Sequence, residues 1–405
     1  MTRDTAESGF IEVDHFQMCK YRQHAPGDVF FSQKNPSDGR IITTLSDGLG
    51  SGIKANVLAT LTATMTTKFV ANNIPILRAA EIIMNTLPVD KEKGISYATF
   101  TTVDIEPNGL VRIMEYDTPP YLLVRDGTMV EPIKESSLFE RKNKKTGPRI
   151  KSEVHYSQYR SCTGDRLIFF SDGVSQAGMG SREYPFGWQT ERVHLFALSL
   201  IAENPGISAR ELATAVVHKA AELDGFMPKD DISCEVIYFR RPRDTLILTG
   251  PPMHAERDQE LGLICDVFKG HKIVCGGTTA NIMSRVLNRP ITVDITHFDP
   301  DIPPFSKMEG VDLVTEGIIT LNAVADLLES AADDAGVVKK DNAATRMVEI
   351  LMNSDRIFFV VGTKINEAHQ DPNMPESLDI RRNIVKRIID LLQTKYLKET
   401  SVQYL

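Results

Sequence analysis

Residues 43–56 read TTLSDGLGSGIKAN, and within these positions an apolar strand pattern changes to the beginning of a helical pattern. Asp47 stands at the change and is followed by glycine at alternate positions, Gly48, Gly50 and Gly52. A reversal of chain direction needs only one glycine. Alternating glycines let the backbone come close to another group, and the carboxylate favours a positively charged one. The segment therefore predicts a strand, an acidic turn and a helix next to a cation.

An apolar strand with an acidic turn occurs twice more, at Asp172 in FFSDGV and at Asp230 and Asp231 in PKDDISCEV. Asp28 opens a further strand pattern, GDVFF. A single Asp-Gly pair is typical of an ordinary turn. Four acidic sites at strand ends would repel one another unless cations lay between them, and oxygen ligands favour Mg²⁺ or Mn²⁺. The pattern therefore favours a shared metal site over four unrelated turns.

Strand patterns separated by turn signals surround two helical patterns. Residues 10–46 contain extended segments, and helical spacing follows over 51–72 and again after Pro75. The predicted apolar face of the first helix consists of Val57, Leu58, Leu61, Met65 and Phe69. Strands then return, the basic and turn-rich stretch 134–151 predicts a loop, and 208–223 predicts a helix before the last strand. Helices embedded between runs of strands predict an α+β sandwich.

The composition is that of a globular protein long enough for two domains, with 405 residues, 42% hydrophobic and 25% charged. A formal net charge of −8 argues against a nucleic-acid binder. No apolar run reaches the roughly 18 residues that span a bilayer, and MTRDTAESGF lacks the apolar core of a signal peptide. The five cysteines form no CxxC pair and indicate reduced thiols. We therefore expect a cytoplasmic protein without nucleic-acid or membrane partners.

Five segments in this order, GDVFF, SDGLGSGIKA, SYATFTTVDI, IFFSDGVSQA and DDISCEVI, give the chain a family resemblance. Together they resemble the metal-dependent protein phosphatases of the type-2C superfamily, in particular the bacterial sporulation stage II protein E branch. The resemblance covers roughly residues 10–240. It implies an α-β-β-α sandwich, in which two antiparallel sheets face each other and helices cover both.

The resemblance also implies roles for the acidic residues. The site would hold two or more Mn²⁺ or Mg²⁺ ions. Asp47 would bridge two of them, and the carbonyl of Gly48 would contact the second. Asp172 and Asp230 would complete the first ion's ligands, and Asp28 would face the second. Asp47, Asp172 and Asp230 are thus the implied catalytic residues. Two ions sharing one water lower its pKa and align it for attack on a phosphoserine or phosphothreonine.

Some positions depart from the family pattern. Many relatives carry Asn-Ala-Gly-His-Pro-Pro where this chain has EYDTPPYLL, so Asp117 and Thr118 replace part of that motif. Relatives often have Glu at the position of Gln176, and Asp231 is expected beside the ions rather than on them. Two alternatives to a protein phosphatase therefore stay open. One is a phosphatase fold used as a regulated binding scaffold, and the other is a hydrolase of a small phosphorylated metabolite.

The pattern changes near residue 243, where four short apolar strands each precede a helix: TLILTGPP, HKIVCGGTTAN, DLVTEGIIT and RIFFVVGTKIN. This predicts a smaller α/β domain with a parallel sheet over 244–405, after a phosphatase domain over 1–243. Ligands bind beyond the carboxyl ends of such strands, and GGTTAN at a helix start could hold an anion. It matches neither the P-loop nor the dinucleotide fingerprint. The alternative is that these small residues only allow strand to turn into helix.

The resemblance extends to partners. Substrates in this branch are usually phosphorylated regulatory proteins, namely antagonists of anti-sigma factors. The domain over 244–405 would then sense a small ligand, or it would support a homodimer or docking through the amphipathic stretch DIRRNIVKRIIDLLQTKYL.

Overall fold

The computed structural model describes residues 9–35, 38–50, 52–86, 98–142, 149–294, 299–330, 341–364, 377–396 and 398–405. The chain divides into two compact units, Met1–Arg241 (unit 1) and Pro242–Leu405 (unit 2). Each unit has its own sheets and its own apolar core.

Unit 1 contains two antiparallel sheets, one in the order β2-β3-β4-β5-β9-β8 and the other in the order β1-β11-β10-β6-β7. The strands are β1 Phe10–Met18, β2 Asp28–Lys34, β3 Ile41–Gly48, β4 Ala98–Ile105, β5 Leu110–Tyr116, β6 Leu122–Arg125, β7 Thr128–Val130, β8 Lys134–Lys142, β9 Arg149–Arg160, β10 Arg166–Phe170 and β11 Ile232–Arg240. The apolar side chains of the two inner faces, such as Leu45 of β3 and Ile237 of β11, meet in one buried cluster.

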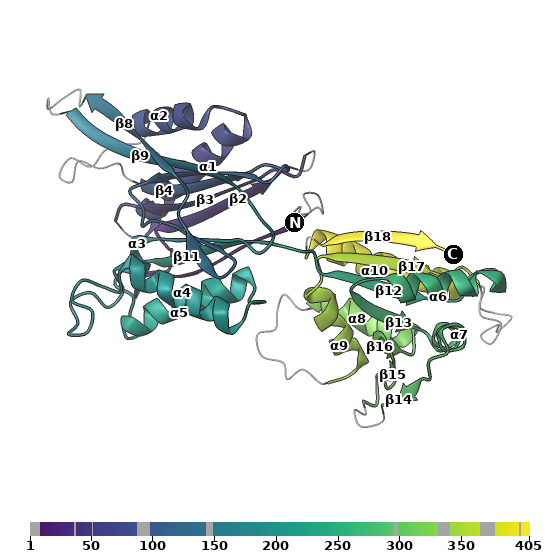
Figure 1. Ribbon diagram of the computed structural model, residues 1–405. Helices are drawn as coiled ribbons and strands as arrows, with labels where there is room; N and C mark the ends of the chain where they lie inside the picture. Colours follow the sequence, from purple (N-terminus) through teal and green to yellow (C-terminus); the bar gives the residue numbers. More distant parts are fainter. Residues whose placement is uncertain are drawn as a thin grey trace. The chain divides into compact units, whose positions relative to one another are not determined.

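Helices cover the outer face of each sheet (Figure 1). Helices α1 Ile53–Ala71 and α2 Ile76–Thr86 lie on the six-stranded sheet, whereas α4 Thr190–Glu203 and α5 Ala209–Leu223 lie on the five-stranded sheet. The short helix α3 Asp172–Ser175 follows β10. The predicted α-β-β-α sandwich is therefore confirmed.

The buried face of α1 differs from the prediction. Val57 and Leu61 are 58% and 45% exposed, whereas Ala55, Ala59 and Ala63 are buried. The helix lies close against β3, where the hydroxyl oxygens of Thr44 and Thr67 are 3.0 Å apart. Small residues permit this close approach. The prediction was therefore wrong for Val57 and Leu61, whereas Phe69 packs against a buried cluster.

The loop predicted over 134–151 is wrong for residues 134–142 and 149–151, which are strand, while residues 143–148 lie outside the described residues. Residues Lys134–Lys142 form β8 and pair with β9 in an antiparallel hairpin. Strand β8 lies at the edge of its sheet, and natural edge strands are rich in charged side chains that prevent pairing with other chains. Some of the charges that suggested a loop, such as those of Arg141 and Lys142, therefore belong to an edge strand.

A buried polar contact joins the two sheets of unit 1. The hydroxyl of Thr43 on β3 donates a hydrogen bond to Oε1 of Glu235 on β11, and both side chains are fully buried. The other carboxyl oxygen, Oε2, has no hydrogen-bond partner among the described residues. Burial raises the pKa of Glu235 to about 8, while the hydrogen bond from Thr43 acts in the opposite direction. Glu235 is therefore held protonated at neutral pH.

Glu235→Gln is expected to flatten the pH dependence of unit 1 stability. A carboxyl whose pKa is raised on folding favours the folded state most below its unfolded pKa, and this contribution is lost as pH rises through about 8. The free energy of unfolding of the wild type should therefore fall by roughly 4 kcal/mol between pH 5 and pH 8 because of this group. That of the variant should not show this fall. Urea unfolding with EDTA, followed by the fluorescence of the single tryptophan, Trp188, measures this difference. Parallel pH curves for the wild type and Glu235→Gln would contradict it, and the exposed Glu153→Gln is the control.

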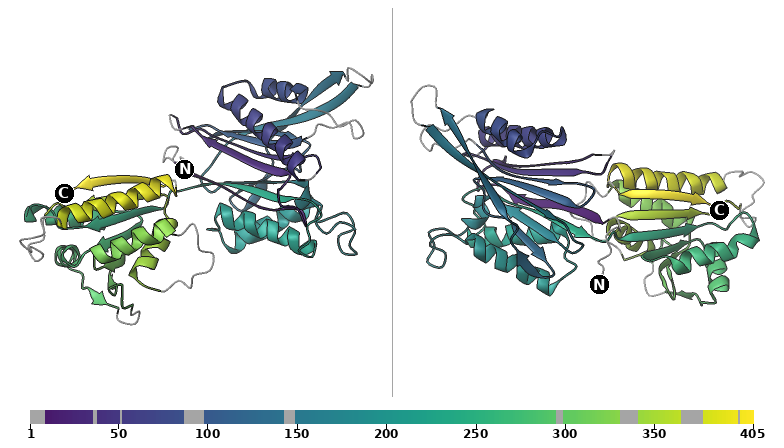
Figure 2. Two further views of the ribbon diagram at one scale, coloured as in Figure 1. Left: turned by 180° about the vertical axis from the view of Figure 1, so that it is seen from behind. Right: turned by 45° about the horizontal axis from the view of Figure 1, so that its top comes forward.

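Unit 2 contains a mixed sheet in the order β14-β15-β16-β13-β12-β17-β18. Its strands are β12 Asp244–Thr249, β13 His271–Cys275, β14 Thr292–Val293, β15 Ser306–Met308, β16 Val311–Thr315, β17 Arg356–Val361 and β18 Glu399–Tyr404. The five strands from β16 to β18 are parallel: four of them were predicted, and β18 was not. The short strands β14 and β15 add an antiparallel edge (Figure 2).

The helices of unit 2 lie on both faces of this sheet. Helices α6 Asp258–Val267 and α7 Gly277–Leu287 pack on the face that carries Leu248 and Val274. Helices α8 Ile318–Ser330, α9 Ala343–Met352 and α10 Ser377–Thr394 pack on the face that carries Ile247 and Ile273. A 3-10 turn, η1 Ala255–Arg257, precedes α6. The parallel strands lie in the order third, second, first, fourth, fifth along the chain, which is typical of a doubly wound sheet.

Within the described ranges, every helix is too short or too polar to span a bilayer.

Candidate metal centre

The four predicted acidic sites meet at one end of the sandwich in unit 1. Asp28 begins β2 and is paired in register with Asp47, near the end of β3, so the two side chains lie next to each other. Asp172 follows β10 and Asp230 precedes β11, and these two strands are neighbours in the other sheet. Each sheet thus contributes two carboxylates.

The pKa values of these carboxyls show how closely they lie. Burial raises the pKa of Asp47 well above its usual range, and the negative charges of Asp28, Asp172 and Asp230 raise it further. Burial also raises the pKa of Asp28 to about 7, against hydrogen bonding from the nearby Ser233. The pKa of Asp172 is raised by burial and then by Asp230. These are carboxylates whose charges repel one another.

The chemistry of this cluster fits a cation. Asp28 is 2% exposed, and its Oδ2 atom has no hydrogen-bond partner among the described residues. The neighbouring cation is Lys20, whose Nζ lies 3.9 Å from Oδ1 of Asp230 at the surface. A hard divalent ion would neutralise the buried charge and accept oxygen ligands. No three acidic, histidine or cysteine side chains of the described chain are placed to hold one ion together. Backbone carbonyls and water would therefore complete the ligands.

The glycines after two of the aspartates are required by close backbone packing. A Cβ atom on Gly48 would lie 2.1 Å from the carbonyl oxygen of Ala55, in the first turn of α1. A Cβ atom on Gly173 would lie 2.1 Å from the carbonyl oxygen of Asp231. Both distances exclude any side chain. The Asp-Gly pairs thus place each carboxylate where the chain is in contact with another segment. The predicted contact between the Gly48 carbonyl and an ion stays a prediction.

Both carboxylate oxygens of Asp231 accept hydrogen bonds from backbone amides. Its Oδ1 accepts a hydrogen bond from the amide of Lys20 at 2.9 Å, and its Oδ2 accepts one from the amide of Gly27 at 2.7 Å. These bonds hold the segment that leads into Asp28. The position suits the predicted supporting role of Asp231 beside the ions.

Comparison with known families gives one match. The sequence model described as Stage II sporulation protein E (SpoIIE) matches residues 37–240, which is half of the chain. The chain belongs to the SpoIIE family. This is a family of type-2C protein phosphatases, and the matched residues include Asp47, Asp172 and Asp230 but not Asp28. No protein of the curated set matches the chain.

Solved structures of low sequence identity have a similar fold. The phosphatase domain with a regulatory fragment of SpoIIE from Bacillus subtilis is 15% identical with a TM-score of 0.45, over 58% of this chain and 65% of that one. The RsbU and RsbW domains of a Mycobacterium tuberculosis protein are 16% identical with a TM-score of 0.43, over 64% and 68%. A serine/threonine phosphatase of S. agalactiae is 13% identical with a TM-score of 0.40, over 57% and 100%. The chain thus spans about two thirds of the SpoIIE fragment.

Two of the departures from the SpoIIE pattern, Gln176 and Asp117, act on Asp172. Gln176, where relatives often have Glu, donates a hydrogen bond from Nε2 to Oδ2 of Asp172 at 2.7 Å. Asp117 has a left-handed backbone with φ of 52°, and its charge contributes to the raised pKa of Asp172. Thr118 pairs with the hydroxyl of Thr101 at 2.9 Å. Sequence reasoning noted these positions but did not place Gln176 and Asp117 around the same carboxylate.

Gln176→Met is expected to weaken Mn²⁺ binding about two- to fivefold. The substitution removes the donor that stabilises the charged form of Asp172, and an exposed hydrogen bond of this kind contributes about 0.5–1 kcal/mol. Calorimetric titration of the full chain with Mn²⁺ measures the change. Gln158→Met, at an exposed position of β9, is the matched control and should bind as the wild type does. An unchanged Mn²⁺ affinity for Gln176→Met would show that Asp172 does not need this donor.

Proposed function

We propose that unit 1 is a metal-dependent phosphatase that removes phosphate from phosphoserine or phosphothreonine in a regulatory protein. The supporting observation is the meeting of Asp28, Asp47, Asp172 and Asp230 at one end of the sandwich in a chain of a phosphatase family. In this proposal Asp47, Asp172 and Asp230 are the catalytic residues, and Asp28 and Gly48 complete the metal site for two or more Mn²⁺ or Mg²⁺ ions.

The chain's own residues would act by holding charge in fixed positions. Bound divalent ions would supply an activated water and neutralise the phosphoryl oxygens. Asp47, in register with Asp28 and close to Asp172, would hold the centre together. Gln176 would keep Asp172 charged and oriented, and Asp231 would fix the segment before Asp28. The mechanism requires no cysteine or serine nucleophile.

The proposed substrate is the phosphorylated antagonist of an anti-sigma factor, the usual substrate in the SpoIIE branch. We further propose that the protein acts in the cytoplasm and that unit 2 supplies regulation, either by binding a small ligand or by forming a homodimer. The Asp231 contacts and the close-packed glycines support a rigid metal site.

A catalytically weak scaffold is the second candidate. It is favoured by the charge of Asp117 near Asp172 and by the lack, in the described chain, of a ready-made three-side-chain metal group. Turnover of a small phosphoester far above that of phosphopeptides would instead favour the metabolite hydrolase.

The test is phosphate release from a phosphoserine peptide with Mn²⁺, with EDTA, and with Mn²⁺ plus Asp172→Asn. Of these three conditions, the proposal expects phosphate release only in the first, from the wild type with Mn²⁺. Asp126→Asn, in an exposed turn, is the control and should retain activity. If Mn²⁺ binds but no phosphate is released under any condition, the scaffold is favoured and the phosphatase proposal fails.

A further inference from the structure

Three polar side chains lie in a row at the carboxyl edge of the sheet in unit 2. Thr249, Cys275 and Thr315 are the last residues of the neighbouring parallel strands β12, β13 and β16, and they are paired in register. Side chains alternate along a strand, so Thr249 faces the same side as Ile247, and Thr315 the same side as Leu313. The row therefore faces α8, α9 and α10.

The hydroxyl groups at this edge are buried without partners. Thr249 and Thr279 are 1% exposed and Thr320 is fully buried, yet among the described residues none of their Oγ1 atoms has a hydrogen-bond partner. The hydroxyl of Thr315 has only the neighbouring Cys275 thiol as a hydrogen-bond partner. A buried hydroxyl without a partner costs about 1–3 kcal/mol. Several such groups at one edge indicate that a polar molecule supplies their partners.

An arginine from another helix reaches the same edge. Arg381, in the second turn of α10, has its Nη1 atom 2.7 Å from the point where a Cβ atom of Gly250 would lie, directly after Thr249. No ion pair or hydrogen bond joins the Arg381 side chain to another described residue. Burial lowers the pKa of Arg381, and no neighbouring carboxylate opposes this. A half-buried guanidinium that has no counter-ion among the described residues is suited to binding an anion.

The start of α7 completes the arrangement. The residue before this helix, Gly276, has φ of 112° and provides no side-chain cap, and the first turn contains no acidic residue. A Cβ atom on Gly277 would meet nothing within 4 Å, whereas the amides of Gly276 and Gly277 donate to the carbonyl oxygens of Thr315 and Glu316 at 2.9 and 3.1 Å. Because α7 begins directly after β13, the positive end of its dipole lies at the carboxyl edge of the sheet.

The topology explains why these groups meet. The chain order reverses between β12 and β17, and helices on the two sides of this point lie on opposite faces of the sheet. Ligands of doubly wound sheets bind at this point, beyond the carboxyl ends of the strands. Lys364, exposed in the turn after β17, adds a further positive charge there.

We propose that the carboxyl edge of the unit 2 sheet binds a small molecule that carries a diphosphate group. Arg381 and the start of α7 would hold the phosphates, and the hydroxyls of Thr249, Thr279 and Thr320 would donate to their oxygens. Thr249 and Thr315 are separated by two strand spacings, about 10 Å. This length suits two linked phosphates better than one.

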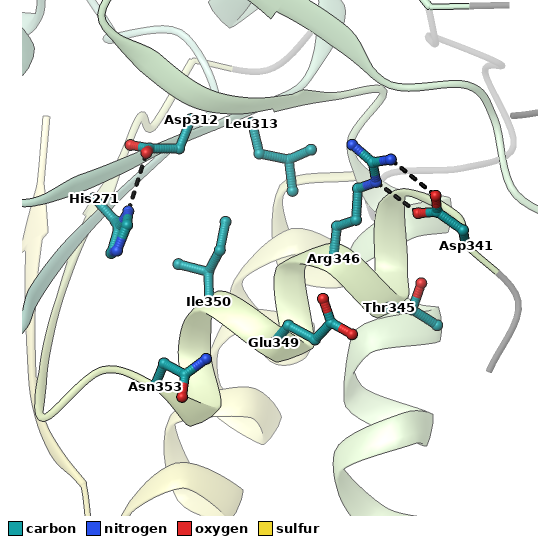
Figure 3. Close-up of a pocket in the computed structure, with 9 residues that line it drawn as sticks. All are labelled: His271, Asp312, Leu313, Asp341, Thr345, Arg346, Glu349, Ile350 and Asn353. Carbon is teal, nitrogen blue, oxygen red and sulfur yellow. Dashed lines mark hydrogen bonds and ion pairs between the residues drawn. The ribbon is translucent and has the colours of Figure 1, made fainter. Parts of the chain in front are cut away.

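A pocket at the opposite edge of the sheet is less suited to an anion (Figure 3). It has a volume of about 610 Å³, and the histidine and arginine side chains that line it already have acidic partners. Nδ1 of His271 lies 3.0 Å from Asp312, and Nε of Arg346 lies 2.6 Å from Asp341. Glu349 adds another negative charge to the lining. This pocket provides a matched control, because Arg346 differs from Arg381 in being neutralised.

The experiment is calorimetric titration of the full chain with inorganic pyrophosphate in EDTA. Removing metal leaves the repelling carboxylates of unit 1 bare, so that unit should not bind the probe. We expect pyrophosphate to bind at least tenfold more tightly than orthophosphate. Arg381→Gln should weaken pyrophosphate binding at least tenfold, and Arg346→Gln should change it less than twofold. No binding by the wild type at 1 mM pyrophosphate, or an equal loss in both variants, would overturn the proposal.

Thr249→Val keeps the test decisive if Arg381→Gln does not fold. The substitution removes a hydroxyl that has no partner in the described structure, so the melting temperature without ligand should stay the same or rise. Pyrophosphate binding should weaken about three- to tenfold. A lower melting temperature together with unchanged binding would mean that the hydroxyl serves the fold alone, and the proposal would be wrong.

Discussion

Asp47→Asn is expected to reduce phosphate release roughly 10³-fold and, without metal, to make unit 1 more stable. Both effects have the same cause. Asp47 is buried among Asp28, Asp172 and Asp230, so its charge is unfavourable until a cation joins the cluster. Replacing the carboxylate by an amide removes that repulsion, which should stabilise the metal-free protein by about 1–3 kcal/mol at pH 8.

Saturating Mn²⁺ should reverse this order of stability. The wild type gains the free energy of metal binding, whereas Asp47→Asn gains little. Urea unfolding with EDTA and with Mn²⁺, together with phosphate release, measures both effects. Asp117→Asn is the control, because it removes an exposed charge near the centre without removing a proposed ligand. If Asp47→Asn were less stable than the wild type in EDTA, the metal-free cluster would not be under repulsion.

Gly48→Ala is expected to destabilise unit 1 by about 3 kcal/mol or more. The added Cβ would lie 2.1 Å from the carbonyl oxygen of Ala55 and 2.6 Å from its carbonyl carbon. Both atoms belong to the backbone of α1, so relief requires the helix to move away from β3. Such a movement would also displace Asp47, and activity should fall with stability.

Urea unfolding followed by Trp188 fluorescence measures this effect in unit 1 alone, because Trp188 is the only tryptophan and belongs to the core under α4 and α5. Gly206→Ala is the matched control. A Cβ there would lie 3.5 Å from a side-chain oxygen of Asn204, an ordinary contact, and its φ is not left-handed. Equal stabilities of Gly48→Ala and Gly206→Ala would mean that α1 can move away from β3 without loss of folding free energy, which would contradict the prediction.

The sequence was informative where several local signals agreed. The runs of strands around helices predicted an α+β sandwich, and the family resemblance carried by the acidic motifs implied its α-β-β-α form and a shared metal site for Asp47, Asp172 and Asp230. It did not reveal the buried face of α1, because small alanines and threonines leave a weak hydrophobic period. Nor did it reveal Glu235, since a glutamate inside a strand looks like a surface residue until the register places it between two sheets.

In unit 2 the parallel strands named in the sequence analysis and their polar ends were predictable. The meeting of these polar ends with Arg381 at the carboxyl edge of the sheet was not. The row of Thr249, Cys275 and Thr315 depends on the strand order, which a single sequence does not determine. Arg381 lies 132 residues after Thr249 along the chain, and no local sequence pattern connects them.

The division of the metal centre between two sheets has a mechanical consequence. Asp28 and Asp47 belong to one layer of the sandwich, and Asp172 and Asp230 flank strands of the other. An ion bound by both pairs would cross-link the layers at their open end, as a disulfide cross-links distant segments. Sliding of one sheet over the other would then require the ion to leave. The stiffness of the sandwich and its capacity for catalysis would therefore be gained and lost together.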